Sequence, residues 1–291
     1  MFKGAMTALV TPFRGGKVDY DALGALVEDQ IARGINGLVP CGTTGESPTL
    51  SEKEHEEIIA FVVKTAKKRV PVIAGTGSNS TQETLHYTRF ALEAGADAAL
   101  LVCPYYNKPS QRGLLAHFRK VADEVGLPQI LYNIQGRTGI NMAPETIAEL
   151  SAHPRIVGVK EASGNLEQMA RIRQLCPPDF SLLSGDDTLT LPILSVGGSG
   201  VISVISNLLP GETSGMVRSY LEGHVKDAQA AFAKHFSLTK TVMGTDANPV
   251  GIKAALAMKG VVTEEYRLPL VPPTDEARAV LKREMTAVGL L

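Results

Sequence analysis

A lysine ends the apolar run Ile156-Val157-Gly158-Val159-Lys160, and a lysine amine is one of the few side-chain groups that attack a carbonyl. A strand that is buried on both faces reads as a continuous run of Val and Ile. Burial disfavours the charged ammonium, so an amine at the end of such a strand has a lowered pKa. A strand-end lysine considered alone more often extends to solvent, so the other polar residues decide the interpretation.

Hydroxyl and guanidinium groups follow other apolar runs of the chain. Gly42-Thr43-Thr44-Gly45 follows residues 37–39, and its hydroxyls and free N–H groups suit a carboxylate. Tyr132 ends the run at 129–132, and Arg137 follows it, placed to bind a second carboxylate. Thr43, Tyr132 and Tyr106 could move protons beside the amine. The ordinary alternatives are a turn without a ligand, a core tyrosine and a solvated arginine.

Metal and phosphate chemistry are disfavoured by the residues after the run at 181–183. Asp186-Asp187 provide too few ligands for a metal, because no histidine lies near them. We expect them to cap the following helix, and their charge opposes a phosphorylated substrate. A buried amine, a hydroxyl relay, an anion-binding turn and an arginine, with no metal and no cofactor, predict Schiff-base chemistry on a small keto acid.

Eight apolar runs alternate with amphipathic segments. The predicted strands are residues 8–10, 37–39, 70–74, 98–102, 129–132, 156–160, 181–183 and 200–204. Capping boxes at Ser51–Glu54 and Ser80–Glu83 begin two of the helices. Eight βα units predict a (β/α)8 TIM barrel, with catalytic groups at the C-terminal ends of its strands. The alternative is an open doubly wound sheet, but Gly75-Thr76-Gly77 lacks the third glycine of its phosphate motif.

The alternation stops near residue 223. We expect a barrel over residues 1–222 and a C-terminal helical region over 223–291, with helices at 226–241, 249–258 and 274–288. Charges are balanced at 29 basic and 30 acidic residues, without a run that would bind nucleic acid. No signal peptide or membrane-length apolar stretch is visible, and the three cysteines predict neither disulfides nor a zinc site. A cytoplasmic location is expected.

Six segments, in their order along the chain, resemble the dihydrodipicolinate synthase family of the N-acetylneuraminate lyase superfamily. They are Gly42–Ser47, Pro104–Pro109, Tyr132-Asn133 with Arg137–Gly139, Gly158–Ala162, Leu183–Asp187 and Gly200–Val204. The resemblance covers the whole chain. It implies a lyase that condenses pyruvate with aspartate semialdehyde, the first committed step of the diaminopimelate route to lysine.

The resemblance also implies roles for individual residues. Lys160 would form the imine with pyruvate, Tyr132 would exchange protons with Thr43, and Tyr106 would enter the relay of a neighbouring subunit. Thr44 would bind the pyruvate carboxylate. The family forms homotetramers built from two tight dimers. Four positions are implied to bind substrates: Thr44, Arg137 (on the carboxylate of aspartate semialdehyde), Gly185 and Ile202.

L-Lysine can inhibit members of this family from a pocket at the subunit interface. The resemblance predicts partial inhibition of this chain as well. Glu52 departs from a histidine that inhibited members can carry, and a second carboxylate suits a cationic ligand. Glu83 and His55 have the simpler alternatives of a capping residue and a helix-face residue. The matching positions are Ser47, Pro48, Glu52, His55, Asn79, Glu83 and Tyr105.

Two further departures and two alternative functions qualify the resemblance. Gln135-Gly136 stands where a proline is common, and Gly251 replaces another, which loosens the backbone before Arg137 and after Pro249. A sister aldolase that cleaves a sialic acid or a 2-keto-3-deoxy sugar acid would share Lys160 with this chain. A barrel that binds a keto acid without turnover would need no proton relay.

Overall fold

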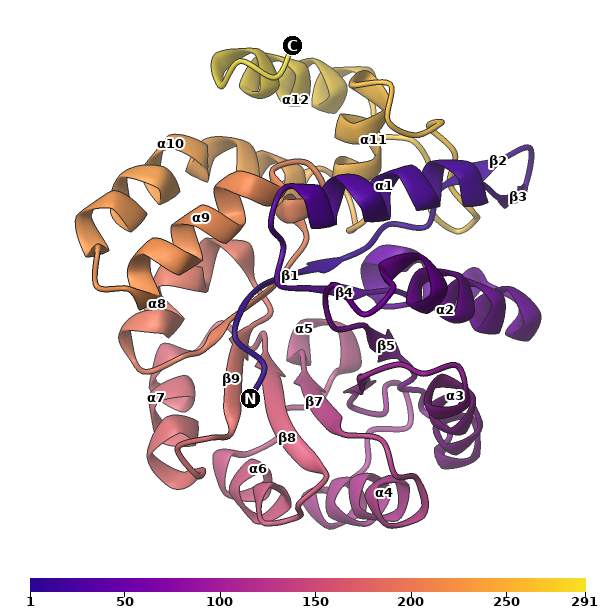
Figure 1. Cartoon of the computed structure of the whole chain (residues 1–291), viewed down its shortest axis with the longest axis vertical. Helices are drawn as coiled ribbons and strands as arrows, with labels where there is room; N and C mark the ends of the chain where they lie inside the picture. The colour runs from indigo at the N-terminus through magenta and orange to yellow at the C-terminus, as the bar shows by residue number, and fades with distance from the viewer.

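Eight parallel strands form a barrel in the computed structural model, which describes residues 1–291 (Figure 1). They lie in the order β4-β1-β10-β9-β8-β7-β6-β5, and a parallel bridge between Leu38 and Val72 closes the ring. The predicted (β/α)8 fold is confirmed. The strands are β1 Gly4–Ala8, β4 Gly37–Val39, β5 Ile73–Gly75, β6 Ala98–Val102, β7 Gln129–Asn133, β8 Ile156–Glu161, β9 Ser181–Ser184 and β10 Gly200–Ser203.

Helices surround the barrel. Ser51 forms the predicted capping box with Glu54 at the start of α2. Ser80 caps α3, but the Glu83 carboxylate accepts from the Ser78 hydroxyl, so the second predicted box is only half formed. The helices are α1 Tyr20–Ala32, α2 Glu52–Ala66, α3 Thr81–Glu93, α4 Gln111–Glu124, α5 Gln135–Thr138, α6 Pro144–Ser151, α7 Leu166–Leu175, α8 Thr190–Ser195 and α9 Pro210–Leu221.

The first strand lies earlier than residues 8–10, where the sequence predicts it. β1 contains Thr7, which is fully buried and hydrogen-bonded to Gln30 and Ser206. A polar residue at a buried position interrupts the apolar pattern from which the strand was predicted. A short ribbon of β2 Phe13–Arg14 and β3 Lys17–Val18 follows, which the pattern does not predict either.

The C-terminal region consists of α10 Val225–Gly244, α11 Val250–Met258 and α12 Asp275–Ala287, close to the predicted helices. In Figure 1 the orange and yellow segments α11 and α12 lie at one end of the molecule, beyond α1. Residues 250–256 of α11 are all buried, so this helix packs as part of the core. No helix combines the length and apolar character needed to cross a bilayer.

Apolar side chains fill two layers. A cluster of 58 buried residues lies in one layer, and a smaller cluster of 10 includes Met6 of β1, Ile130 and Tyr132 of β7, and Ile202 of β10. Strand residues alternate between the barrel interior and the outer helices. The candidate residues Tyr132 and Ile202 therefore share one apolar layer, next to which Lys160 emerges.

Candidate active site

Lys160 and Tyr132 lie side by side on neighbouring strands. The parallel pairing of β7 with β8 aligns Tyr132 with Lys160, and both residues are 5% exposed. The Lys160 Nζ lies 4.2 Å from the centroid of the Tyr132 ring. The sequence predicts this juxtaposition only through the fold, because the two residues end different strands of one barrel.

Burial lowers the pKa of Lys160 to about 8, with the carboxylate of Asp187 opposing the shift and the Arg137 guanidinium adding to it. A desolvated amine of this kind is neutral often enough near neutral pH to act as a nucleophile. No carboxylate forms an ion pair with Lys160. The amine is therefore buried without a counter-ion in contact.

Gly185 leaves the space that the lysine side chain occupies. A Cβ atom at this position would lie 2.7 Å from the Cβ of Ala162 and 3.1 Å from the Cε of Lys160. Any larger residue would therefore displace the aliphatic stem of the lysine. Ile202 is 1% exposed in β10, within the apolar layer that includes Tyr132.

The turn after β4 holds two threonines with free amides. The N–H groups of Gly45, Glu46 and Ser47 donate to carbonyl groups inside the turn, whereas those of Thr43 and Thr44 have no backbone acceptor. The Thr44 hydroxyl accepts from Asn248 Nδ2 at 3.0 Å. Two adjacent unpaired amides with a hydroxyl form a site that suits an anion.

Tyr132 is buried beside this turn. Burial raises the pKa of its phenol to about 12, while Arg137 and the Thr43 hydroxyl oppose the rise. The phenol therefore stays protonated at neutral pH, and it can donate to or accept from a neighbouring oxygen. Lys160, Tyr132 and Thr43 thus come together from β8, β7 and the turn after β4.

A cleft of about 340 Å³ opens beside the turn. Arg137 is exposed at this cleft, and its Nη2 donates to the carbonyl of Asn248 at 3.2 Å. It lies in the short helix α5, in which no proline fixes the backbone. The cleft is lined by Thr43, Ser47, Pro48, Leu50, His55, Gly77, Ser78, Glu83, Tyr87, Val102, Tyr105, Ile134, Arg137 and Thr138.

Tyr106 is the one predicted relay residue that the single chain leaves apart. It is 88% exposed, has a left-handed backbone with φ of 73° and does not line the cleft. Its neighbour Tyr105 does line the cleft. An exposed tyrosine held in this conformation presents its ring to whatever lies outside the chain.

The positions predicted to bind L-lysine divide into two groups. Ser47, Pro48, His55, Glu83 and Tyr105 line the cleft, whereas Glu52 and Asn79 do not. The Nε2 of His55 contacts the carbonyl of Gly75 at 2.8 Å, and its ring stacks on Tyr87. Burial lowers the pKa of His55, so it faces the cleft as a neutral ring.

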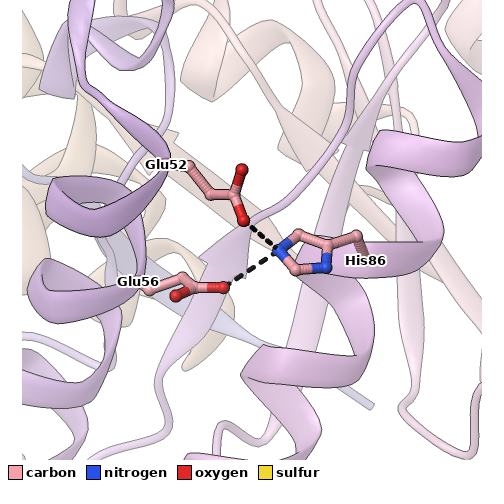
Figure 2. A group of neighbouring side chains, drawn as sticks. All are labelled: Glu52, Glu56 and His86. Carbon is pink, nitrogen blue, oxygen red and sulfur yellow. Dashed lines mark ion pairs between the residues drawn. The ribbon is translucent and has the colours of Figure 1, made fainter.

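Glu52 is directed toward His86 (Figure 2). The His86 Nε2 lies 3.0 Å from a carboxylate oxygen of Glu52 and 3.0 Å from a carboxylate oxygen of Glu56. These two contacts join α3 to α2. These donor atoms lie within 4.8 Å of one another, as the ligands of a metal ion would. The side chains of Glu52 and His86 are at least half exposed, and an ordinary surface ion pair accounts for the arrangement.

Several residues that bear on the site were missed by sequence reasoning. Asn248 contacts both Thr44 and Arg137 from the C-terminal region. Asp186 caps the following turn as expected, but the Asp187 carboxylate is buried and accepts from the amides of Val204 and Ile205. Asp187 lies in the first turn of the following helix, where its charge was expected, but it is not a cap there, because its carboxylate is used at the end of β10. No local pattern marks these long-range contacts.

Comparison with known proteins agrees with this geometry. Residues 1–288 match the model of the dihydrodipicolinate synthetase family. The chain belongs to this family. It is 53% identical to the 4-hydroxy-tetrahydrodipicolinate synthase of Citrifermentans bemidjiense, with 100% of both chains covered.

Two solved structures of the family have the same fold. The dihydrodipicolinate synthase of Aquifex aeolicus is 44% identical with a TM-score of 0.98, and the match covers 99% of each chain. The enzyme of Cyanidioschyzon merolae, solved with lysine bound, is 44% identical with a TM-score of 0.97 over 100% of this chain and 99% of that one. This chain is therefore a Schiff-base-forming lyase of the dihydrodipicolinate synthetase family. A sister sugar-acid aldolase and a non-catalytic keto-acid-binding barrel are not favoured.

Proposed function

We propose that this chain condenses pyruvate with L-aspartate-4-semialdehyde to give 4-hydroxy-tetrahydrodipicolinate, through an imine on Lys160. The observation that carries the proposal is the buried amine of Lys160, which has no carboxylate in contact and lies 4.2 Å from the Tyr132 ring. Pyruvate and aspartate semialdehyde are the substrates of the enzyme after which the relatives are named. The residues that would bind two carboxylates, the Thr43-Thr44 turn and Arg137, lie at the same cleft or beside it.

In the first half of the reaction the neutral amine of Lys160 attacks C2 of pyruvate. The carbonyl oxygen takes up protons and leaves as water, which gives the imine. The amides of Thr43 and Thr44 hold the pyruvate carboxylate. Tyr132 and Thr43 carry protons to the departing oxygen, for which the protonated phenol is suited.

In the second half a proton leaves C3 of the imine, and the resulting enamine attacks the aldehyde carbon of the second substrate. The aldehyde oxygen becomes a hydroxyl, and a new C–C bond forms. The amino group of the second substrate then attacks the imine carbon, so that the ring closes and Lys160 leaves as a free amine. Arg137 binds the carboxylate of this substrate at the mouth of the cleft.

We further propose that the functional unit is a tight dimer in which Tyr106 completes the proton relay of the partner subunit. Its 88% exposure and left-handed backbone support this role. The homotetramer implied by the family resemblance would be two such dimers. The cytoplasm remains the expected location.

Borohydride reduction in the presence of pyruvate tests the proposal. The peptide that contains Lys160 should gain the mass of a reduced pyruvyl group, and Lys160→Ala should abolish the label. The peptide with Lys253, the other deeply buried lysine, is the internal control and should stay unmodified. A label on another lysine, or none, would refute the mechanism.

A further inference from the structure

A second buried lysine lies outside the reaction described above. The Nζ of Lys253 in α11 contacts a carboxylate oxygen of Glu46 at 2.6 Å, and both side chains are 0% exposed. The amine also lies 4.3 Å from the centroid of the Phe13 ring and 5.3 Å from that of Tyr266. Two opposite charges are thus enclosed by aromatic rings, away from solvent.

Glu46 belongs to the turn that holds the free amides of Thr43 and Thr44. It has φ of 55° and ψ of 34°, and its own amide donates to the carbonyl of Thr43. This left-handed conformation is one that glycine adopts readily and that residues with a Cβ rarely adopt. A glutamate at this position indicates that its side chain is needed, and the only side-chain cation in contact with it is Lys253.

The other Glu46 oxygen accepts from the amide of Arg267 at 3.1 Å. Arg267 itself holds Glu54 through two nitrogen atoms, at 2.7 and 2.5 Å. Glu54 lies in the first turn of α2, directly after the threonine turn. The C-terminal region therefore contacts this segment at both Glu46 and Glu54, and Asn248, just before α11, contacts Thr44 on the N-terminal side of Glu46.

Lys253 is not a second nucleophile. It pairs with a carboxylate that stabilises its ammonium, and it lines no part of the cleft. The corresponding contact is absent at Lys160. Its only route to the chemistry is through Glu46 and the turn.

We propose that Lys253 is a positioning residue for the carboxylate-binding turn, and that its ion pair with Glu46 holds the amides of Thr43 and Thr44 where the substrate carboxylate binds. The inference rests on the proposed function, because it assigns the turn to the carboxylate of pyruvate. It predicts that the pair determines how strongly Lys160 prefers a carbonyl compound that carries a carboxylate.

The test compares the trapping of two carbonyl compounds by borohydride: pyruvate, and acetone, which lacks the carboxylate. The double variant Glu46→Gln/Lys253→Met keeps the side-chain volumes and leaves no unpaired buried charge. We expect its pyruvate-to-acetone ratio of trapping rates to fall at least fivefold, and its KM for pyruvate to rise by more than its kcat falls. Arg278→Gln, which removes an ion pair with Glu264 in the same region, should leave the ratio unchanged.

An equal slowing with both compounds, or an unchanged ratio, would overturn the inference and leave the pair a purely structural role. If thermal melting shows that the double variant is unfolded, Glu46→Asp replaces it. Aspartate keeps the charge but shortens the reach by one methylene, so we expect at least a twofold fall in the ratio, and an unchanged ratio again refutes the inference. A wild-type chain that traps no pyruvate would refute the proposed function instead.

Discussion

Two buried lysines in this chain differ in their partners. Burial lowers the pKa of both, but the Glu46 carboxylate opposes the shift at Lys253, whereas Lys160 has no carboxylate in contact. Lys160 was found from the sequence because it ends an apolar run. Lys253 is the one charged residue in the sequence of α11, and its sequence neighbours do not show whether its side chain is buried or points to solvent. A candidate nucleophilic lysine can be recognised in the sequence when it ends an apolar strand. Whether a carboxylate neutralises its charge is visible only in the structure.

The pH dependence of pyruvate use should report the amine of Lys160. Because the neutral form attacks and the pKa is about 8, kcat/KM for pyruvate should rise about tenfold per pH unit below pH 8 and level off above it. The Asp187 carboxylate raises this pKa, so Asp187→Asn should move the inflection to lower pH. Steady-state kinetics across pH 6 to about 10 provide the measurement. A rate that keeps rising to the upper end of this range, as expected for the ordinary lysine value of 10.5, would contradict the assignment.

Arg137→Ala should affect the aldehyde substrate and spare pyruvate. The variant loses a charge-assisted pair with a carboxylate, which contributes about 1.5–3 kcal/mol, so KM for aspartate semialdehyde should rise well over tenfold. Borohydride trapping of pyruvate should continue at a similar rate. Arg112→Ala, at an arginine outside the cleft, is the control. Equal losses for both substrates would mean that Arg137, through its contact with Asn248, supports the scaffold.

The pair Tyr132 and Lys160 depends on the alignment of β7 with β8. Buried polar residues next to this pair fix that alignment. Asn133 pairs in register with Glu161, one residue beyond Tyr132 and Lys160. The fully buried Glu161 carboxylate accepts from Asn133 Nδ2 at 2.9 Å, from the Ser163 amide at 2.7 Å and from Gln168. A one-residue slip would break these bonds and turn Lys160 away from the interior.

Glu161→Ala should therefore destabilise the barrel. The change removes the acceptor of three hydrogen bonds, leaves the Ser163 amide with no acceptor and opens a cavity, so the free energy of unfolding should fall by about 2–4 kcal/mol. Glu149→Ala, which removes a surface ion pair with Arg119, should change it by less than about 0.5 kcal/mol. Urea unfolding of the two variants provides the comparison. A loss at Glu161 as small as that at Glu149 would mean that these buried polar residues do not hold the strands.

At the same scale, apolar runs located seven of the eight strands within a few residues. They failed at β1, where Thr7 is buried but finds polar partners on α1 and after β10. The pattern of apolar and polar residues does not indicate whether a residue distant in the sequence will form a hydrogen bond with the Thr7 hydroxyl. The βα order, in contrast, follows from the alternation itself.

Across the whole molecule, the site depends on contacts between distant parts of the chain. Glu46 and Lys253 are separated by 207 positions, and Asn248 and Thr44 by 204. Such contacts could not be predicted from the sequence, since spacing and periodicity describe neighbours only. The motifs point to Lys160, Tyr132, Thr43 and Arg137 because each lies near the C-terminal end of a strand of a recognisable barrel or soon after it. Tyr106 is predicted from its motif and from the family resemblance, but it is exposed in the single chain, because its proposed partner is another chain.

Mixing two inactive variants tests whether Tyr106 acts across a dimer. Lys160→Ala and Tyr106→Phe should both have low activity alone. In a mixed dimer one site has its own Lys160 and the partner's intact tyrosine, so random exchange should restore about a quarter of the wild-type activity. Lys160→Ala mixed with Tyr132→Phe should restore none, because both of these residues come from one chain. Failure of the first mixture, with mixed dimers verified by mass, would place Tyr106 outside the relay.

L-Lysine should bind at the cleft and inhibit partially. Glu83 and the neutral His55 line the cleft together with Tyr105, and a relative of the same fold was solved with lysine bound. Coupling between two sites is typically about 1–3 kcal/mol, which corresponds to several-fold inhibition. Glu83→Ala should abolish the effect, whereas Glu93→Ala, at the far end of α3, should preserve it. Calorimetry without binding heat and unchanged initial rates at millimolar lysine would reject the prediction.

The burial of Lys160 has a consequence for the folded state itself. A pKa lowered from 10.5 to about 8 means that the ammonium is about 3 kcal/mol less favourable in the barrel than in the unfolded chain. The folded state bears this whole penalty below pH 8, and the penalty disappears as the pH rises past 10.5, where both states hold a neutral amine. A barrel with methionine at this position would be inert and more resistant to heat. Catalytic activity and thermal stability thus make opposite demands on residue 160, and a chain that retains the reaction also retains the less stable fold.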